Sequence, residues 1–183
     1  MNWLQTTSLL VLTFMAVFIQ GTWDLPHSWL GAQLSLLPSL VVYAAIQTDV
    51  VTLALVSVLG GLWADSLSAN PFGLSILPLF WLGFMLHRWR DLLLRELTYA
   101  QCVMGIMAGV AVPLLTLLLL LSMGAHPLLG GWSLWQLGVL GVAGGCLTPP
   151  TFWLMERLVA TFSYQPVKAT PFRADREIKR GRH

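Results

Sequence analysis

The stretch GGLWADSLSANPFG, residues 60–73, decides how the chain is interpreted. It places Asp65 between two long apolar segments, and no other Asp, Glu, Lys or Arg occurs from Val50 to Leu86. A carboxylate next to hydrocarbon is costly unless it reaches water, accepts hydrogen bonds or serves a function. The stretch therefore predicts a helical hairpin at a membrane surface, in which Asp65 either fixes the turn or lines a ligand or partner site.

The composition predicts an integral membrane protein. The chain has 183 residues, of which 56% are hydrophobic and only 10% are charged, and its mean hydropathy is +0.73. A soluble domain of this length carries about 25% charged residues, so the chain lacks the ionic surface that a soluble fold needs.

Six membrane-spanning helices are expected when the chain is divided at its polar and turn-forming clusters, because a span needs about 20 mainly apolar residues. The six expected spans are residues 3–22, 29–46, 50–67, 71–87, 98–123 and 133–155. Residues 1–163 then form one transmembrane domain, and residues 164–183 form a flexible basic tail with too little apolar surface to fold alone.

The basic residues orient this bundle. All Lys and Arg residues lie in two groups, one from Arg88 to Arg95 and the other from Arg157 to the C-terminus. Short loops that are rich in Lys and Arg stay in the cytoplasm. Two spans separate the groups and four precede the first, so we expect a compact all-α six-helix bundle with both termini in the cytoplasm.

The hairpin has three further features. Small residues recur at helical spacing before Asp65 and give the third span a face for close helix packing; they are Ser57, Gly61, Ala64 and Ser68. Asn70 suits the N-cap of the fourth helix, with Pro71 at its first position. Gly73 is expected to allow close packing in that first turn.

Two other patterns suggest contact surfaces. Gly105 with Gly109, and Gly141 with Gly145, form small-xxx-small pairs in the last two spans, which either pack inside the bundle or dock another membrane helix; internal packing is favoured. Arg88 and Arg90 begin a basic loop at the inner interface, where they can meet anionic lipid headgroups or a cytoplasmic partner. Prolines within four of the spans, at positions 38, 78, 113 and 149–150, predict bent helices.

Catalysis finds no support in the sequence. The His residues are isolated, and no zinc-protease motif, nucleophile elbow or phosphate-binding loop occurs. Cys102 and Cys146 lie in apolar segments and are expected to be core residues. We therefore expect no enzyme activity, no metal and no cofactor, and no nucleic-acid binding, since topology accounts for the basic residues.

The run GGLWADSLSANPFGLSILPLFWLGFMLHRW, residues 60–89, resembles the rod shape-determining membrane protein MreD family. The shared pattern is a glycine-rich span that ends in an Asp, then the spacing from Asp65 to Pro71 to Gly73, then a span that leads to a basic loop. The resemblance implies a non-catalytic scaffold of the bacterial elongation complex in the inner membrane. Its expected partner is an MreC-like single-span protein, which links it to MreB, to RodA and to a penicillin-binding transpeptidase.

The same resemblance leaves a second function open. MreD-like proteins look distantly like the vitamin-binding S components of energy-coupling-factor transporters, which implies a small-molecule-binding subunit as the alternative. A polar pocket around Asp65, Ser66 and Asn70, lined by Trp63, would favour that alternative. The chain lacks the Ala-xxx-Ala face of such subunits in its first span, which argues against it.

Overall fold

A computed structural model describes residues 3–22, 35–68, 71–90, 98–124 and 131–162. Its helices are α1 (Trp3–Thr22), α3 (Leu37–Gln47), α4 (Val50–Ser66), α5 (Ile76–Trp89), α6 (Thr98–Ser122) and α7 (Gly131–Phe162). Within the described ranges every regular element is a helix and no strand occurs. The all-helical fold class is therefore confirmed.

Three of these helices, α1, α6 and α7, are long and apolar enough to cross a membrane. Helices α3 and α4 are apolar but shorter, with 11 and 17 residues. At 1.5 Å per residue, α3 rises about 16 Å, roughly half of a hydrocarbon core of about 30 Å. The lengths indicate a membrane protein with at least these three spanning candidates.

The predicted helix boundaries agree with the structure to within two residues for residues 3–22, 50–67 and 98–123. The other three differ. The second span was expected from residue 29, but residues 29–34 lie outside the described part and α3 begins at Leu37. The fourth helix begins at Ile76, five residues later than expected, and α7 extends to Phe162.

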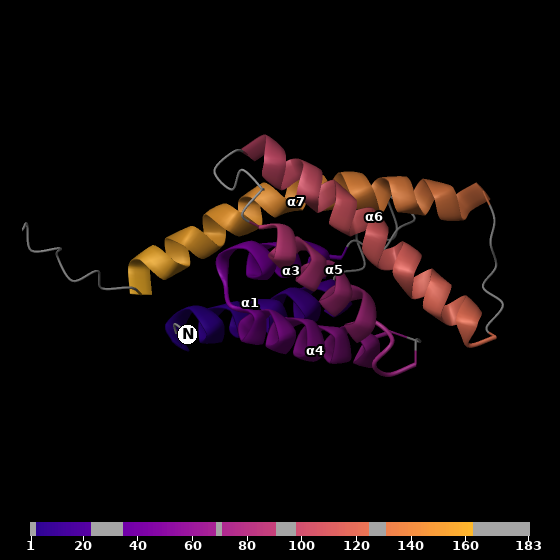
Figure 1. The fold of residues 1–183 in the computed structure, drawn as a ribbon, viewed down its shortest axis with the longest axis horizontal. Helices are drawn as coiled ribbons and strands as arrows, with labels where there is room; N and C mark the ends of the chain where they lie inside the picture. The colour runs from indigo at the N-terminus through magenta and orange to yellow at the C-terminus, as the bar shows by residue number, and fades with distance from the viewer. Residues whose placement is uncertain (1–2, 23–34, 69–70, 91–97, 125–130, 163–183) are drawn as a thin grey trace, which may run out of the picture.

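The helices form three layers, with α1 and α4 on one side, α3 and α5 between, and α6 and α7 on the other (Figure 1). Helix α3 is the centre of this arrangement and packs against each of the other five helices. Every residue from Leu37 to Ile46 is buried. A helix that is apolar all round finds its most stable place inside a bundle, where every face meets another helix.

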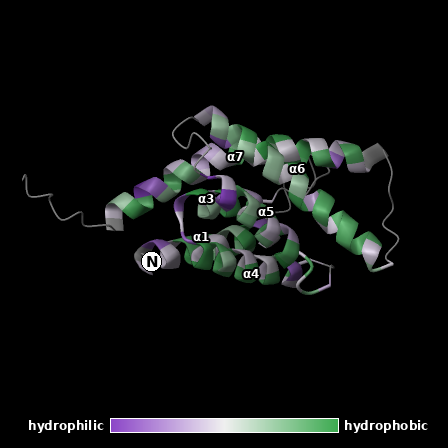
Figure 2. Cartoon of the chain, viewed as in Figure 1, coloured by the Kyte–Doolittle hydropathy of each residue, from purple (hydrophilic) through white to green (hydrophobic). Residues whose placement is uncertain are grey.

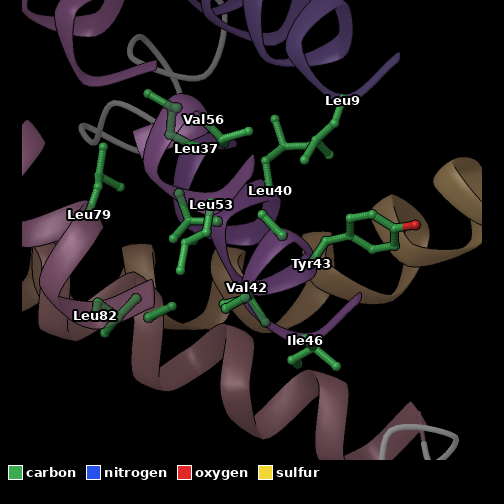
Figure 3. Packing of buried hydrophobic residues seen from close by; sticks show 14 of the residues in the cluster. Leu9, Leu37, Leu40, Val42, Tyr43, Ile46, Leu53, Val56, Leu79 and Leu82 are labelled. Atoms are coloured by element: carbon green, nitrogen blue, oxygen red, sulfur yellow. The ribbon is translucent and has the colours of Figure 1, made fainter. Parts of the chain in front are cut away.

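The side chains of α3 radiate toward its neighbours. Figure 3 shows Leu40 and Tyr43 of α3 together with Leu9 of α1 and Leu53 of α4 in one cluster of buried residues. The Tyr43 ring packs edge-on against Phe152 of α7, with 5.0 Å between the ring centroids. This cluster joins all three layers into one core.

Hydrogen bonds show which helix ends lie together. The Thr6 and Thr52 hydroxyls are 2.9 Å apart and join the beginnings of α1 and α4. His87 Nδ1, near the end of α5, lies 2.8 Å from the Ala45 carbonyl oxygen, near the end of α3. At the opposite end, Leu36 N–H donates to Gln20 Oε1 at 3.3 Å and joins the end of α1 to the beginning of α3. Successive helices among α1, α3, α4 and α5 therefore run in alternating directions.

The prolines affect the helices unequally. Pro38 lies in the first turn of α3 and Pro78 in the first turn of α5, where backbone N–H groups have no helical acceptor. The expectation that these two bend their helices was wrong, because both helices begin later than predicted. Pro113 and the Pro149–Pro150 pair do lie inside α6 and α7. Helix α7 changes direction along its length (Figure 1), as two interior prolines predict.

Candidate functional site: the Asp65 hairpin, the helix seam and a polar cavity

Asp65 is buried near the end of α4, with 1% of its surface exposed. Its Oδ2 accepts a hydrogen bond from Ser75 N–H at 3.1 Å, and its Oδ1 accepts one from Ser75 Oγ at 2.5 Å. Ser75 is the N-cap residue of α5. Both carboxylate oxygens thus hold the N-cap residue of the next helix, and a carboxylate at a helix N-terminus is also favoured by the helix dipole.

Two glycines allow this contact. A Cβ on Gly61, one turn before Asp65, would lie 3.0 Å from both the Cα and the N of Ile76, so a larger residue would push α5 away. Gly73 has a φ of +88°, in the left-handed region that glycine adopts without strain. The space around Gly73 is ordinary, so its expected role in close packing was wrong and its role is conformational.

The predicted cap of α5 was also wrong. Pro71 lies five residues before the helix and instead accepts a turn hydrogen bond from Leu74 N–H at 3.2 Å. Asn70 lies outside the described residues. The Asn-Pro pair is a common local start signal, but here the distant Asp65 carboxylate engages Ser75 and the helix begins after it. Sequence reasoning missed Ser75 because its partner lies ten residues away.

The basic end of α5 contacts the end of α3. Arg90 Nη1 donates to the Thr48 carbonyl oxygen at 3.5 Å, and His87 Nδ1 contacts the Ala45 carbonyl oxygen. The last carbonyls of a helix lack helical partners, so donors from α5 stabilise this end of α3. Arg88 is exposed and remains available to lipid or protein.

The expected glycine pairs lie where α6 crosses α7. A Cβ on Gly105 would lie 2.4 Å from the Gly144 carbonyl oxygen, and one on Gly109 would lie 2.4 Å from the Leu140 carbonyl oxygen. From α7, Gly141 and Gly145 face Val110 and Ile106 of α6. Gly144, which the two-pair pattern had not included, lies closest to α6, since its Cβ would be 2.3 Å from the Gly105 carbonyl oxygen. These glycines form an internal seam that brings the two backbones into contact.

A polar cavity of about 810 Å³ lies between the end of α3, the beginning of α6 and the second half of α7. It is lined by Gln47, Thr98, Gln101, Pro149, Pro150, Phe152, Trp153 and Glu156. A second, apolar groove of about 320 Å³ lies between α5 and α6 and is lined by Leu77, Pro78, Trp81, Leu115, Leu118, Leu119 and Ser122. Neither was predicted, because each is built from segments that are far apart in the sequence.

In the described ranges, no group of three or more His, Cys, Asp or Glu side chains is placed to hold a metal ion. Asp65, Ser75, Gly61 and Gly73 together form a structural contact that holds the end of α4 against the beginning of α5. Comparison of the chain with protein-family models, with curated proteins and with solved structures finds no match.

Proposed function

We propose that the chain is a non-catalytic membrane scaffold of the bacterial rod-shape complex, similar to MreD. In this function it binds an MreC-like single-span protein in the inner membrane and, through that protein, MreB, RodA and a penicillin-binding transpeptidase. The proposal rests first on the resemblance of residues 60–89 to that family.

The main support for the proposal is the structural role of two residues in the motif that the chain shares with the MreD family. Its Asp, Asp65, holds Ser75 with both oxygens, and its Gly, Gly73, supplies the left-handed turn that brings Ser75 into reach. The motif residues therefore have a structural purpose that needs no substrate. A motif used in this way suits a protein whose task is to present a fixed surface.

The proposed topology is six spans with both termini in the cytoplasm. It is supported by the positions of two basic residues. Arg90 directly follows α5 and contacts the end of α3. Arg157 lies in α7 next to Glu156, and Glu156 lines the same cavity as Gln47, the last residue of α3. Arg90 bonds to Thr48, which follows Gln47 directly. Arg90 and Arg157, which belong to the described part of the two basic groups, thus lie toward the same end of the bundle, which supports the proposed cytoplasmic side.

The alternative, a vitamin-binding transporter subunit, was tied to a polar pocket around Asp65 near Trp63. Asp65 is instead engaged by Ser75, and both of the cavities described above are lined by other residues. We therefore propose the scaffold.

Affinity purification of the full chain from native membranes tests this function. The expected result is recovery of an MreC-like protein, and an Asp65→Leu variant should recover less because the α4–α5 hairpin is displaced. Recovery of transporter ATPases without an MreC-like protein would overturn the proposal.

A further inference from the structure

Helix α6 is held against the core of the bundle near its middle. Met104 and Ala108 are the α6 residues that belong to the buried core of the described residues, and Ala100, Ala111 and Val112 pack beside them while partly exposed. Three of these five side chains are single methyl groups, which bury little apolar area and interlock little with their neighbours. The contact between α6 and the core is therefore shallow.

Open space borders α6 on both sides of this contact. Toward the beginning of the helix, Thr98 and Gln101 line the polar cavity of about 810 Å³. Toward its end, Leu115, Leu118 and Leu119 line the apolar groove of about 320 Å³. The cavity separates α6 from the end of α3, and the groove separates it from α5. A helix with a shallow contact at its middle and space at both ends has room to tilt.

The groove can open and close at little cost in free energy. Its lining is apolar apart from Ser122, and the second half of α6 is hydrophobic along its length (Figure 2). In a membrane, apolar side chains that leave a protein neighbour meet lipid chains of similar polarity, so the hydrophobic effect does not hold the groove closed. Tilting of α6 therefore exchanges one set of apolar contacts for another.

Helix α7 changes its packing partner at residues 148–150. Before this point Gly141, Gly144 and Gly145 are buried and face α6. After it, Phe152 and Met155 are buried in the core. The first part of α7 thus belongs with α6, and the second part belongs with the core.

Two prolines and a buried threonine lie at this change of partner. Pro149 and Pro150 have no backbone N–H, so two successive helical hydrogen bonds of α7 are missing. The Thr148 hydroxyl lies 3.2 Å from Ser39 Oγ of α3, and Gly105 of α6 lies against the same hydroxyl. A helix bends most readily where its hydrogen bonds are interrupted, and here that point is attached to α3.

We propose that residues 98–122 and 131–148, the α6–α7 unit, tilt as one body about Ala108 and Thr148. The glycine seam keeps the two helices of the unit together, and the proline pair is the hinge. Because the cavity and the groove lie at opposite ends of α6, the tilt closes one as it opens the other. Anything that fills one space thereby changes the shape of the other end of the bundle. This motion does not depend on the cell-shape function.

Double electron–electron resonance measures the tilt in the full chain, with the two native cysteines replaced by Ala. Spin labels on Leu77→Cys with Leu118→Cys span the groove, and labels on Thr98→Cys with Glu156→Cys span the cavity. All four side chains are exposed, so the labels do not displace the core. Leu118 and Thr98 lie about 15 Å from Ala108 along α6, so a tilt of about 15° moves each by about 4 Å. We expect two populations, about 4 Å apart, in both distance distributions.

A third pair of labels tests whether the unit is rigid. Leu118→Cys with Leu134→Cys joins the exposed sides of α6 and the first part of α7, and its distance distribution should show one population. A single population for the groove pair or for the cavity pair would overturn the proposal. So would two populations for the pair within the unit.

A wedge in the groove tests the opposite changes of the two spaces. Leu115→Trp enlarges a groove-lining side chain and pushes the second half of α6 outward, so the labels at positions 98 and 156 should shift to their shorter distance. Leu114→Trp is the matched control, because Leu114 is exposed and is not part of the groove lining. No shift with Leu115→Trp, a lengthening, or an equal shift with Leu114→Trp would contradict the coupled motion.

The hinge is tested by restoring its hydrogen bonds. Pro149→Ala combined with Pro150→Ala supplies both missing N–H groups and should reduce each distribution to one population. Pro71→Ala, at an exposed proline outside the helices, should leave both distributions unchanged. Two persisting populations in the double variant would overturn the assignment of the hinge. Thermal unfolding identifies variants that lose the fold, and the three label pairs in the otherwise unmodified chain decide the tilt without these variants.

Discussion

The buried carboxylate of Asp65 connects α4 to α5, and we predict that its removal destabilises the protein. Asp65→Leu would leave Ser75 N–H and Oγ without their acceptor in a partly buried position, which costs about 1–3 kcal/mol. We expect a lower midpoint of thermal unfolding in detergent. Asp65→Asn should lose less, because its amide oxygen can still accept one of the two bonds.

The control for this change is an exposed carboxylate. Asp49→Asn, at the exposed N-cap of α4, should shift the midpoint much less, because Asn is as good an N-cap residue as Asp. Equal shifts for Asp49→Asn and Asp65→Leu would contradict the role of the Asp65–Ser75 contact.

Gly73 provides a second prediction at the residue scale. Gly73→Ala places a Cβ at a φ of +88°, which costs about 1–2 kcal/mol, although the nearest atom, Ile76 Cδ1, would be a comfortable 3.8 Å away. Gly138→Ala in α7 is the matched change without strain, since its Cβ would meet no atom within 4 Å apart from the adjoining backbone of its own helix. It should be neutral or stabilising by up to about 1 kcal/mol. Chemical or thermal unfolding in detergent measures both; a stable Gly73→Ala variant would show that the turn can rearrange.

At the scale of the helices, the α6–α7 seam decides whether the last layer of the bundle holds together. Gly105→Ala would place a methyl group 2.2 Å from Thr148 Oγ1 and 2.4 Å from the Gly144 carbonyl oxygen, and the backbone oxygen cannot move independently of α7. We expect at least about 2 kcal/mol of destabilisation, as for overpacking of a tight core. Gly138→Ala again serves as the control on α7. Comparable unfolding midpoints for the two variants would show that α6 and α7 separate without cost.

The element scale also shows what could be predicted from the sequence. Helices α1, α4 and α6 were placed well, because long apolar runs between polar clusters are local signals. The glycine pairs were recognised because small residues at a spacing of four predict close packing wherever they occur. The pattern does not identify which helix these glycines contact. The contact of Gly144 with α6 could be recognised only from the packing of α7 against α6.

Contacts between distant segments explain what could not be predicted. The beginning of α5 depends on a hydrogen bond from Ser75 to Asp65, and the end of α3 depends on His87, which is 42 residues away from Ala45 in sequence. No local pattern carries such a pairing. The polar cavity was missed for the same reason, since Gln47, Gln101 and Glu156 meet only in three dimensions.

For the whole molecule, the central question is how often the chain crosses the membrane. Helices α1, α6 and α7 can span it by length, whereas α3 and α4 are shorter. A buried central helix can be short, because its neighbours rather than lipid surround it. The contacts of Arg90 with Thr48, and of Tyr43 with Phe152, hold the ends of α3 and α5 and the late part of α7 on one side of the bundle. This arrangement favours an even number of crossings between the two basic groups.

Cysteine labelling from outside intact cells measures this topology. In a chain whose native Cys102 and Cys146 are replaced by Ala, single cysteines at Arg90 and Arg180 should react with a membrane-impermeant maleimide only after the cells are opened, because the proposed topology places both groups of basic residues in the cytoplasm. A cysteine at Leu67, at the opposite end of α4, should react in intact cells, since Leu67 is exposed and close to the Asp65 hairpin. Labelling of the Arg90 or Arg180 position from outside would contradict the six-span topology.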